Sequence, residues 1–185
     1  MLPASTGDRK QRDISKGKQD GRGVEIQRLI GRSLRVGIDF EALGERSVYV
    51  DCDVLESDGG TRTASVTAGY IGVALALDAL RKRALLGGGV LREPVAAVSV
   101  GWAAGRALLD VCYEEDRDAE MDLNVVGTRS GAIIEVQGTA EASPIPRERF
   151  DAMLSLGLGS MPALVARQRT ALERAGVDLD ALLRT

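Results

Sequence analysis

A glycine-rich run at residues 58–65 is the part of the sequence best suited to chemistry. It reads Asp-Gly-Gly-Thr-Arg-Thr-Ala-Ser and separates an alternating, strand-like segment from a long apolar, helix-like one. Glycines at such a turn let the backbone approach a ligand, and the free N–H groups of a first helical turn favour an anion. We expect Thr61 to cap the helix and Arg62 to add a charged, planar donor fork. The run indicates a phosphate or phosphodiester site, although an ordinary glycine turn with a threonine cap explains the same residues.

A second group of chemically capable residues is acidic. The stretch 114–122 consists mostly of Asp and Glu and joins two strand-like segments, so it lies near the end of a predicted sheet. Two carboxylates can hold one Mg²⁺ while water and a substrate phosphate fill its other positions. Asp116 and Asp122 are the pair that we expect to do so. Taken alone, the stretch is more simply interpreted as a solvated acidic loop.

The composition limits the chemistry that is available. The 185 residues suit a single domain with a sizeable core, and the formal net charge is −3. The chain has no histidine, which excludes a Ser-His-Asp triad, a Cys-His pair and any histidine-ligated metal. Oxygen ligands remain, and they favour Mg²⁺ or Mn²⁺. Cys52 and Cys112 lie in apolar runs and suit buried, reduced thiols better than a disulfide or a zinc site.

Basic residues gather at the N-terminal end of this otherwise acidic chain. Lys and Arg outnumber Asp and Glu in residues 1–35, which suggests contact with a polyanion, although a solvated arm explains them as well. Residues 1–20 are polar and are expected to form a loop or arm ahead of a domain over 21–185. No charge-free run reaches transmembrane length and no signal-peptide core is present, so a cytoplasmic protein without membrane contact is the default expectation.

Apolar periodicity predicts an α+β domain with helices packed on one face of a sheet. The predicted helices span 22–40, 62–86, 146–156 and 161–174, and a short turn can follow at 179–183. The predicted strands span 47–55, 95–102, 107–113, 123–128 and 132–137. The glycines at 87–89 are expected to end the second helix, and Ser130-Gly131 to form a hairpin between the last two strands.

An ordered series of motifs runs from residue 1 to about residue 174. It comprises Lys-Gly-Lys-Gln at 16–19 with Gly-Arg at 21–22, Glu-Ile-Gln-Arg-Leu-Ile at 25–30, Asp-Cys-Asp-Val-Leu at 51–55, the glycine-rich run at 58–65, Ala-Ala-Val-Ser-Val-Gly at 96–101, Asp-Leu-Asn-Val-Val at 122–126 and Ile-Glu-Val-Gln-Gly-Thr-Ala-Glu at 134–141. The series resembles the ribonuclease PH family of bacterial phosphorolytic 3′-to-5′ exoribonucleases, which trim transfer-RNA precursors. The resemblance implies a ribonuclease PH-like domain (ribosomal protein S5 domain 2-like) with a mixed sheet, assembled as a hexameric ring, a trimer of dimers.

The resemblance also implies roles for individual residues. Those matching the positions that hold the attacking inorganic phosphate are Arg22, Gly60, Thr61 and Arg62. Those matching the metal-binding and catalytic positions are Asp116 and Asp122, with Mg²⁺ or Mn²⁺ as the cofactor. Arg9 and Arg12 match the family positions at which RNA enters. The resemblance therefore implies a basic RNA-binding arm over 1–20 and a catalytic domain over 21–185. A positive charge at the start of a helix opposes the helix dipole, so Arg22 independently favours a nearby anion.

The implied activity is phosphorolysis, in which phosphate replaces water as the nucleophile at the last phosphodiester and a nucleoside diphosphate is released. Positioning and electrostatics supply most of the catalysis in such chemistry. Two departures from the family pattern concern the N-terminal end. Family members begin with about sixty more residues, so we expect the first strands to be missing and a sheet edge to be exposed. Ala4 and Gly7 stand where arginine and histidine are usual.

Two other functions remain open on the sequence. The chain can be a catalytically inactive subunit of the same fold that binds RNA or assembles into a ring. It can also be a hydrolytic magnesium nuclease, which would release monophosphates without added phosphate. The identity of the released nucleotides separates all three functions.

Overall fold

The computed structural model of the chain describes residues 5, 21–141 and 143–184. The predicted RNA-binding residues Arg9 and Arg12 lie outside the described residues, together with nearly all of the predicted arm. The helices are α1 (Gly21–Val36), α2 (Phe40–Leu43), α3 (Thr61–Lys82), α4 (Tyr113–Arg117), α5 (Arg147–Arg174) and α6 (Leu179–Leu182). The strands are β1 (Val95–Ala103), β2 (Arg106–Leu109), β3 (Met121–Thr128) and β4 (Ile133–Ala140).

The four strands form one sheet in the order β2-β1-β3-β4. Every neighbouring pair is antiparallel, with Val98 of β1 opposite Val125 of β3, and Val125 opposite Val136 of β4. The α+β class, the four C-terminal strands and the Ser130-Gly131 hairpin are thereby confirmed. The expectation of a mixed sheet is wrong for the described residues, because tight turns join β1 to β2 and β3 to β4, and β3 returns along β1 in the opposite direction.

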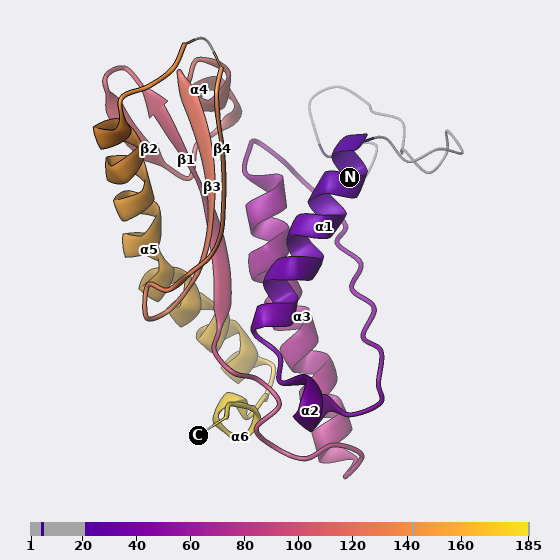
Figure 1. Ribbon diagram of the computed structural model, residues 1–185. Helices are drawn as coiled ribbons and strands as arrows, with labels where there is room; N and C mark the ends of the chain where they lie inside the picture. The colour runs from indigo at the N-terminus through magenta and orange to yellow at the C-terminus, as the bar shows by residue number, and fades with distance from the viewer. Residues whose placement is uncertain (1–4, 6–20, 142, 185) are drawn as a thin grey trace.

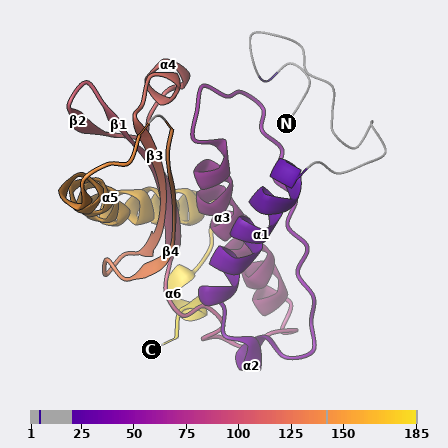
Figure 2. The same cartoon turned by 45° about the horizontal axis from the view of Figure 1, so that its top comes forward.

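Helices cover both faces of the sheet, so the expectation that they pack on one face is wrong. Helix α5 lies on one face, and α3 lies on the other with α1 packed outside it (Figures 1 and 2). Side chains of β1 alternate between the two layers: Val95 and Ala97 belong to the cluster with α3, whereas Val98 and Val100 pack with α5. A continuous apolar run in a central strand is the pattern that two covered faces require.

Helix α3 is the core helix on its side of the sheet. Val66, Tyr70 and Leu77 are at most 1% exposed. Among the described residues α3 alone is long and apolar enough to cross a membrane by length and composition, but a buried core helix meets the same criterion. It ends at Lys82, earlier than predicted, since Ala84 already adopts a left-handed backbone with φ 56°.

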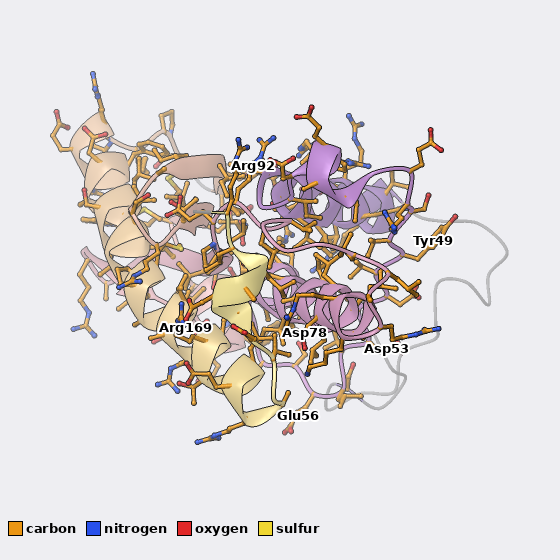
Figure 3. The ribbon with its side chains drawn as sticks, turned by 90° about the horizontal axis from the view of Figure 1, so that it is seen from below. Tyr49, Asp53, Glu56, Asp78, Arg92 and Arg169 are labelled. Atoms are coloured by element: carbon orange, nitrogen blue, oxygen red, sulfur yellow. The ribbon has the colours of Figure 1, made fainter. Side chains whose placement is uncertain are left out.

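The predicted strand at 47–55 is wrong. The segment is extended but pairs with no strand among the described residues, and it runs beside α1 and α3 (Figure 1). The Cys52 thiol lies 3.7 Å from the carbonyl oxygen of Ser65 on α3, and Val48 packs against the core. Tyr49 is 89% exposed and points away from the molecule (Figure 3). The alternation reflects burial of one row of side chains against helices, which does not require a partner strand.

Helix α5 is one helix of 28 residues, although two helices were predicted. Pro162 removes one backbone donor and favours a break, but Met161 just before it and Val165 just after it are buried against the sheet. Gly157 lets the helix approach closely, because a Cβ there would lie 2.9 Å from Cγ2 of Val125. Tertiary packing therefore outweighs the local helix-breaking residues. The short turn predicted at 179–183 is confirmed as α6.

Candidate active site

The glycine-rich turn packs against the chain that leads into the acidic stretch. A Cβ on Gly59 would lie 2.4 Å from the carbonyl oxygen of Val111, and the φ of Gly59 is 143°. The backbone N–H of Tyr113 donates to Oδ1 of Asp58 across 3.4 Å. Only glycine fits where two backbones come this close. The turn thus joins the two motifs that the sequence analysis singled out, the start of α3 and the acidic stretch.

The start of α3 differs from the prediction in one respect. Gly60 is the N-cap residue, with a left-handed φ of 55°, and Thr61 is the first helical residue, so the expectation of a Thr61 side-chain cap is wrong. The Gly60 carbonyl accepts from the backbone N–H of Ala64 and from the Thr63 hydroxyl. Gly60 offers no side-chain cap to the first-turn N–H groups, so these remain suited to an anion.

A cleft of about 400 Å³ opens beside this helix start. Its lining comes from α1, α3, β3 and β4 and consists of Glu25, Arg62, Asp122, Asn124, Val136, Gln137, Gly138 and Thr139. Strand register explains the polar wall: Asp122 pairs with Thr139 and Asn124 with Gln137, so both pairs lie on one face of the sheet. That is the face on which α3 and α1 pack, which places Arg62 opposite these side chains.

Asp122 is half-buried, and its Oδ1 has no hydrogen-bond partner among the described residues. Burial raises the pKa of Asp122, and the negative charges of Asp116 and Glu141 raise it further, whereas the positive charge of Arg62 lowers it. The structure therefore brings together Asp116, Asp122 and Arg62, three of the residues chosen from the sequence. Asp116 lies on α4, a short helix within the stretch that was predicted to be a loop.

The Asp116–Asp122 pair fits a hard divalent cation. The unpaired, buried oxygen of Asp122 is a donor that Mg²⁺ prefers, and the negative charge of Asp116 adds to the attraction for a divalent cation. Within the part of the chain that the structure describes, no group of three or more His, Cys, Asp or Glu side chains could hold a metal ion. A Mg²⁺ ion on this pair would therefore need water and substrate oxygens to complete its coordination.

Arg62 forms an ion pair that the sequence did not reveal. Its Nη1 lies 3.4 Å from Oε1 of Glu25, which belongs to α1. Glu25, Asn124 and Gln137 all line the cleft, yet sequence reasoning gave none of them a role. Asn124 and Gln137 could have been chosen from the sequence, because an amide side chain inside an otherwise apolar strand is unusual at a buried position. The position of Glu25 depends on how α1 packs on α3, which no local pattern shows.

Arg22 lies outside the lining of the cleft. It is exposed in the first turn of α1, three residues before Glu25, which places both on neighbouring turns of one helix face. The structure describes no hydrogen bond or ion pair for Arg22. Of the four residues expected to hold phosphate, Gly60, Thr61 and Arg62 are contiguous at the start of α3, and Arg22 lies on the adjacent helix.

Comparison with known proteins identifies the family. Two family models match, the 3′ exoribonuclease family domain 1 over residues 1–77 and domain 2 over residues 93–160. Arg62 belongs to the first match and both aspartates belong to the second, so the cleft lies where the two meet.

Two solved structures share the fold at low sequence identity. The Archaeoglobus fulgidus exosome with RNA bound to the active site has a TM-score of 0.59 and 16% identity over 82% of this chain and 63% of that chain. Rice (Oryza sativa) Rrp46 has a TM-score of 0.61 and 16% identity over 85% of this chain and 68% of that one. This chain thus spans less than two thirds of the archaeal chain. It has the ribonuclease PH-like α+β fold and belongs to the ribonuclease PH family, the 3′ exoribonuclease family.

Proposed function

We propose that the chain is a phosphate-dependent 3′-to-5′ exoribonuclease that trims the 3′ ends of tRNA precursors and releases nucleoside diphosphates. One observation carries the proposal: Arg62 and Asp122 face the same cleft, and the charge of Asp116 acts on Asp122. This arrangement sets an anion-binding side chain and helix start beside a carboxylate pair suited to Mg²⁺. Family membership supports 3′ exoribonuclease chemistry, and the exosome structure described above has RNA at its active site.

The reaction follows from these groups. An oxygen of inorganic phosphate attacks the phosphorus of the last phosphodiester bond, and the bond to the 3′ oxygen of the preceding nucleotide breaks. The attacking oxygen becomes the bridging oxygen of the nucleoside diphosphate, and the 3′ oxygen takes a proton. Arg62 and the N–H groups at the start of α3 hold the phosphate and neutralise its charge, which lets two anions approach each other.

The opposite wall of the cleft would hold the RNA end. Asp116 and Asp122 would bind Mg²⁺, which supplies positive charge to the transferring phosphoryl group when bound. One of the two carboxyl groups can instead carry the proton that the leaving 3′ oxygen requires. Asn124 and Gln137 present amide groups that can bind hydroxyl groups of the last nucleotide.

The products of RNA degradation test this function. A transfer RNA with a short 3′ extension is incubated with the chain and Mg²⁺, with and without phosphate, and the released nucleotides are identified. Nucleoside diphosphates that form only with phosphate are the expected result. Monophosphates formed without phosphate would instead show a hydrolytic magnesium nuclease and refute the proposal.

A catalytically inactive subunit is the second candidate, because one structure that shares this fold belongs to an exosome and a shared fold alone does not determine activity. In that case the folded chain would bind RNA or join a ring such as a homohexamer, and it would release no nucleotide. Substituting Arg62 by alanine would then leave ring assembly unchanged. Size-exclusion chromatography with light scattering, run beside the degradation assay, distinguishes this outcome from an unfolded preparation.

A further inference from the structure

A second pocket, of about 240 Å³, lies far from the candidate active site. Four arginines line it, and these are Arg92, Arg129, Arg169 and Arg184. Strand β3 carries the chain from Asp122 at the cleft to Thr128 beside this pocket, a length of about 20 Å. Figure 3 views the molecule from this end, with Arg92 and Arg169 labelled. No part of the proposed reaction uses these arginines.

The four arginines come from four separate parts of the fold. Arg92 precedes β1, Arg129 lies in the turn between β3 and β4, Arg169 lies on α5 and Arg184 follows α6. Like charges that converge in this way repel one another unless anions lie among them. The arrangement therefore calls for negative charge at this end of the sheet.

Protein carboxylates supply part of that charge and fix three of the guanidinium groups. Nη1 of Arg184 lies 2.7 Å from Oδ2 of the buried Asp39, and Nε of Arg92 lies 3.8 Å from the same oxygen. Arg169 pairs with Asp180 at 2.7 Å and lies 3.8 Å from Oε1 of Glu173. Each guanidinium has five N–H donors, so one or two carboxylates leave donors free for a further anion.

The remaining charged groups of the lining favour an added anion. Arg129 forms no hydrogen bond or ion pair within the described part of the chain, whereas Glu93, the carboxylate of the lining, already accepts from the backbone N–H of Ser130 at 3.1 Å. One arginine is thus without a counter-charge of its own. The lining carboxylate is turned towards the hairpin backbone.

A buried hydroxyl group on α3 is also unpaired. Tyr70 is 1% exposed, and its hydroxyl has no hydrogen-bond partner among the described residues. Burial raises the pKa of Tyr70, the charge of Arg169 lowers it and that of Glu93 raises it. An unsatisfied polar atom at this depth is uncommon in a folded protein.

We propose that this pocket binds a small phosphorylated molecule through its phosphate or diphosphate group. The planar forks of several arginines match the oxygens of phosphate, and the two contacts that one fork can make give such pairs their strength. The volume is below the range that encloses a whole drug-sized ligand, so the phosphate groups are held and the rest of the molecule extends into solvent.

Binding of inorganic pyrophosphate tests the proposal. Calorimetric titration with pyrophosphate is carried out on the full chain carrying Arg62→Ala, a substitution that weakens binding of pyrophosphate at the candidate active site. Adding Arg129→Ala is expected to weaken binding about tenfold, and adding Arg92→Ala as well to abolish it. Arg167→Ala is the matched control, because Arg167 is an exposed arginine of α5 outside the pocket, and it is expected to change nothing. Equal binding in all these variants would overturn the proposal.

Two further arms fix the chemistry of the ligand. Succinate carries two negative charges without phosphate, and binding as tight as that of pyrophosphate would overturn the phosphate assignment. A short single-stranded RNA that binds at Arg129 and that pyrophosphate does not displace would instead assign the surface to the RNA path and contradict the proposal. Pyrophosphate binding that persists when Arg62→Ala abolishes phosphorolysis separates this pocket from the candidate active site.

Chemical modification provides a readout that needs no variant. Phenylglyoxal modifies accessible arginines, and mass spectrometry locates the modified residues. Pyrophosphate is expected to protect Arg129 and Arg92 in the unmutated chain and to leave Arg167 reactive. Equal modification of Arg129 with and without pyrophosphate would contradict the proposed site.

Discussion

Arg62 of α3 and Glu25 of α1 form an ion pair across the cleft, with 3.4 Å between Nη1 and Oε1. The side chains are 24% and 53% exposed, and a pair this accessible contributes only about 0–1 kcal/mol. Phosphate carries more charge than a carboxylate and can take two donors from one guanidinium. Glu25 is therefore a weak competitor that a phosphate ion can displace from Arg62.

Glu25→Gln is expected to lower the KM for phosphate about threefold with little change in kcat, because it removes the competing charge and not a group that contacts the reacting atoms. Initial rates measured over a range of phosphate concentrations test this. Glu148→Gln, an exposed glutamate in the first turn of α5, is the control. A higher KM in the Glu25 variant would mean that Glu25 orients Arg62 for phosphate, contrary to this prediction.

Asp122 is expected to reduce the stability of the fold at neutral pH. Its pKa is raised above the ordinary value of 3.8, so the folded protein holds this proton more tightly than the unfolded chain does. The stability from this group is fully present below pH 3.8 and is lost as the pH rises through the raised pKa. Asp122→Asn should therefore raise the Tm at pH 7 and reduce kcat about a hundredfold or more.

Thermal unfolding of the unmutated chain and the Asp122→Asn variant at pH 7 and pH 3 checks this prediction. The gain in Tm from the substitution should be present at pH 7 and should shrink at pH 3, where both side chains are uncharged. A lower Tm for Asp122→Asn at pH 7 would show that the carboxylate is stabilised by a partner and would contradict the prediction.

Mg²⁺ is expected to stabilise the chain at pH 7, by about 2–4 °C in Tm for each 1 kcal/mol of binding free energy. The effect should fade at pH 3, because the ligands must lose their protons to bind a metal. Asp116→Asn and Asp122→Asn should each remove it. Asp118→Asn should not, since Asp118 belongs to the same acidic stretch but pairs with Arg117. Stabilisation that survives both ligand substitutions would place the metal elsewhere.

Several features of the fold could be predicted because they depend on neighbouring residues. The apolar run at 95–102, the glycine-rich turn and the hairpin at 130–131 each carry a local signal, and each prediction of an element there was confirmed. Arg62 could be chosen because it follows that turn. The pairing of Arg62 with Glu25 could not, since 37 positions separate them and only the packing of α1 on α3 brings them together.

The errors have a common physical origin in tertiary packing. Alternation at 47–55 records burial of one side of an extended segment, and it cannot show whether a strand lies beside it. The segment 157–160, which contains two glycines, was predicted to separate two helices, but the sheet stabilises one continuous helix through it. Thr61 is a good capping residue by type, yet Gly60 occupies the N-cap position and Thr61 is the first residue of the helix.

The glycines of α5 yield a paired prediction on stability. A Cβ on Gly157 would lie 2.9 Å from Cγ2 of Val125, so Gly157→Ala is expected to destabilise by about 1–3 kcal/mol through overpacking. A Cβ on Gly159 would meet nothing within 4 Å, so Gly159→Ala should stabilise the helix by about 0.5–1 kcal/mol. Urea unfolding measures both, and stabilisation by both substitutions would show that α5 does not pack against β3 as described.

The origin of the oxygen atoms in the product tests the proposed activity most directly. The chain is incubated with RNA, Mg²⁺ and inorganic phosphate whose oxygens carry a heavy isotope, and the released nucleotides are analysed by mass spectrometry. If phosphate held by Arg62 is the nucleophile, the label will appear in the terminal phosphate of nucleoside diphosphates, and Arg62→Ala will reduce its rate of appearance about a hundredfold or more. Unlabelled monophosphates, or no released nucleotide from the folded chain, would contradict this account.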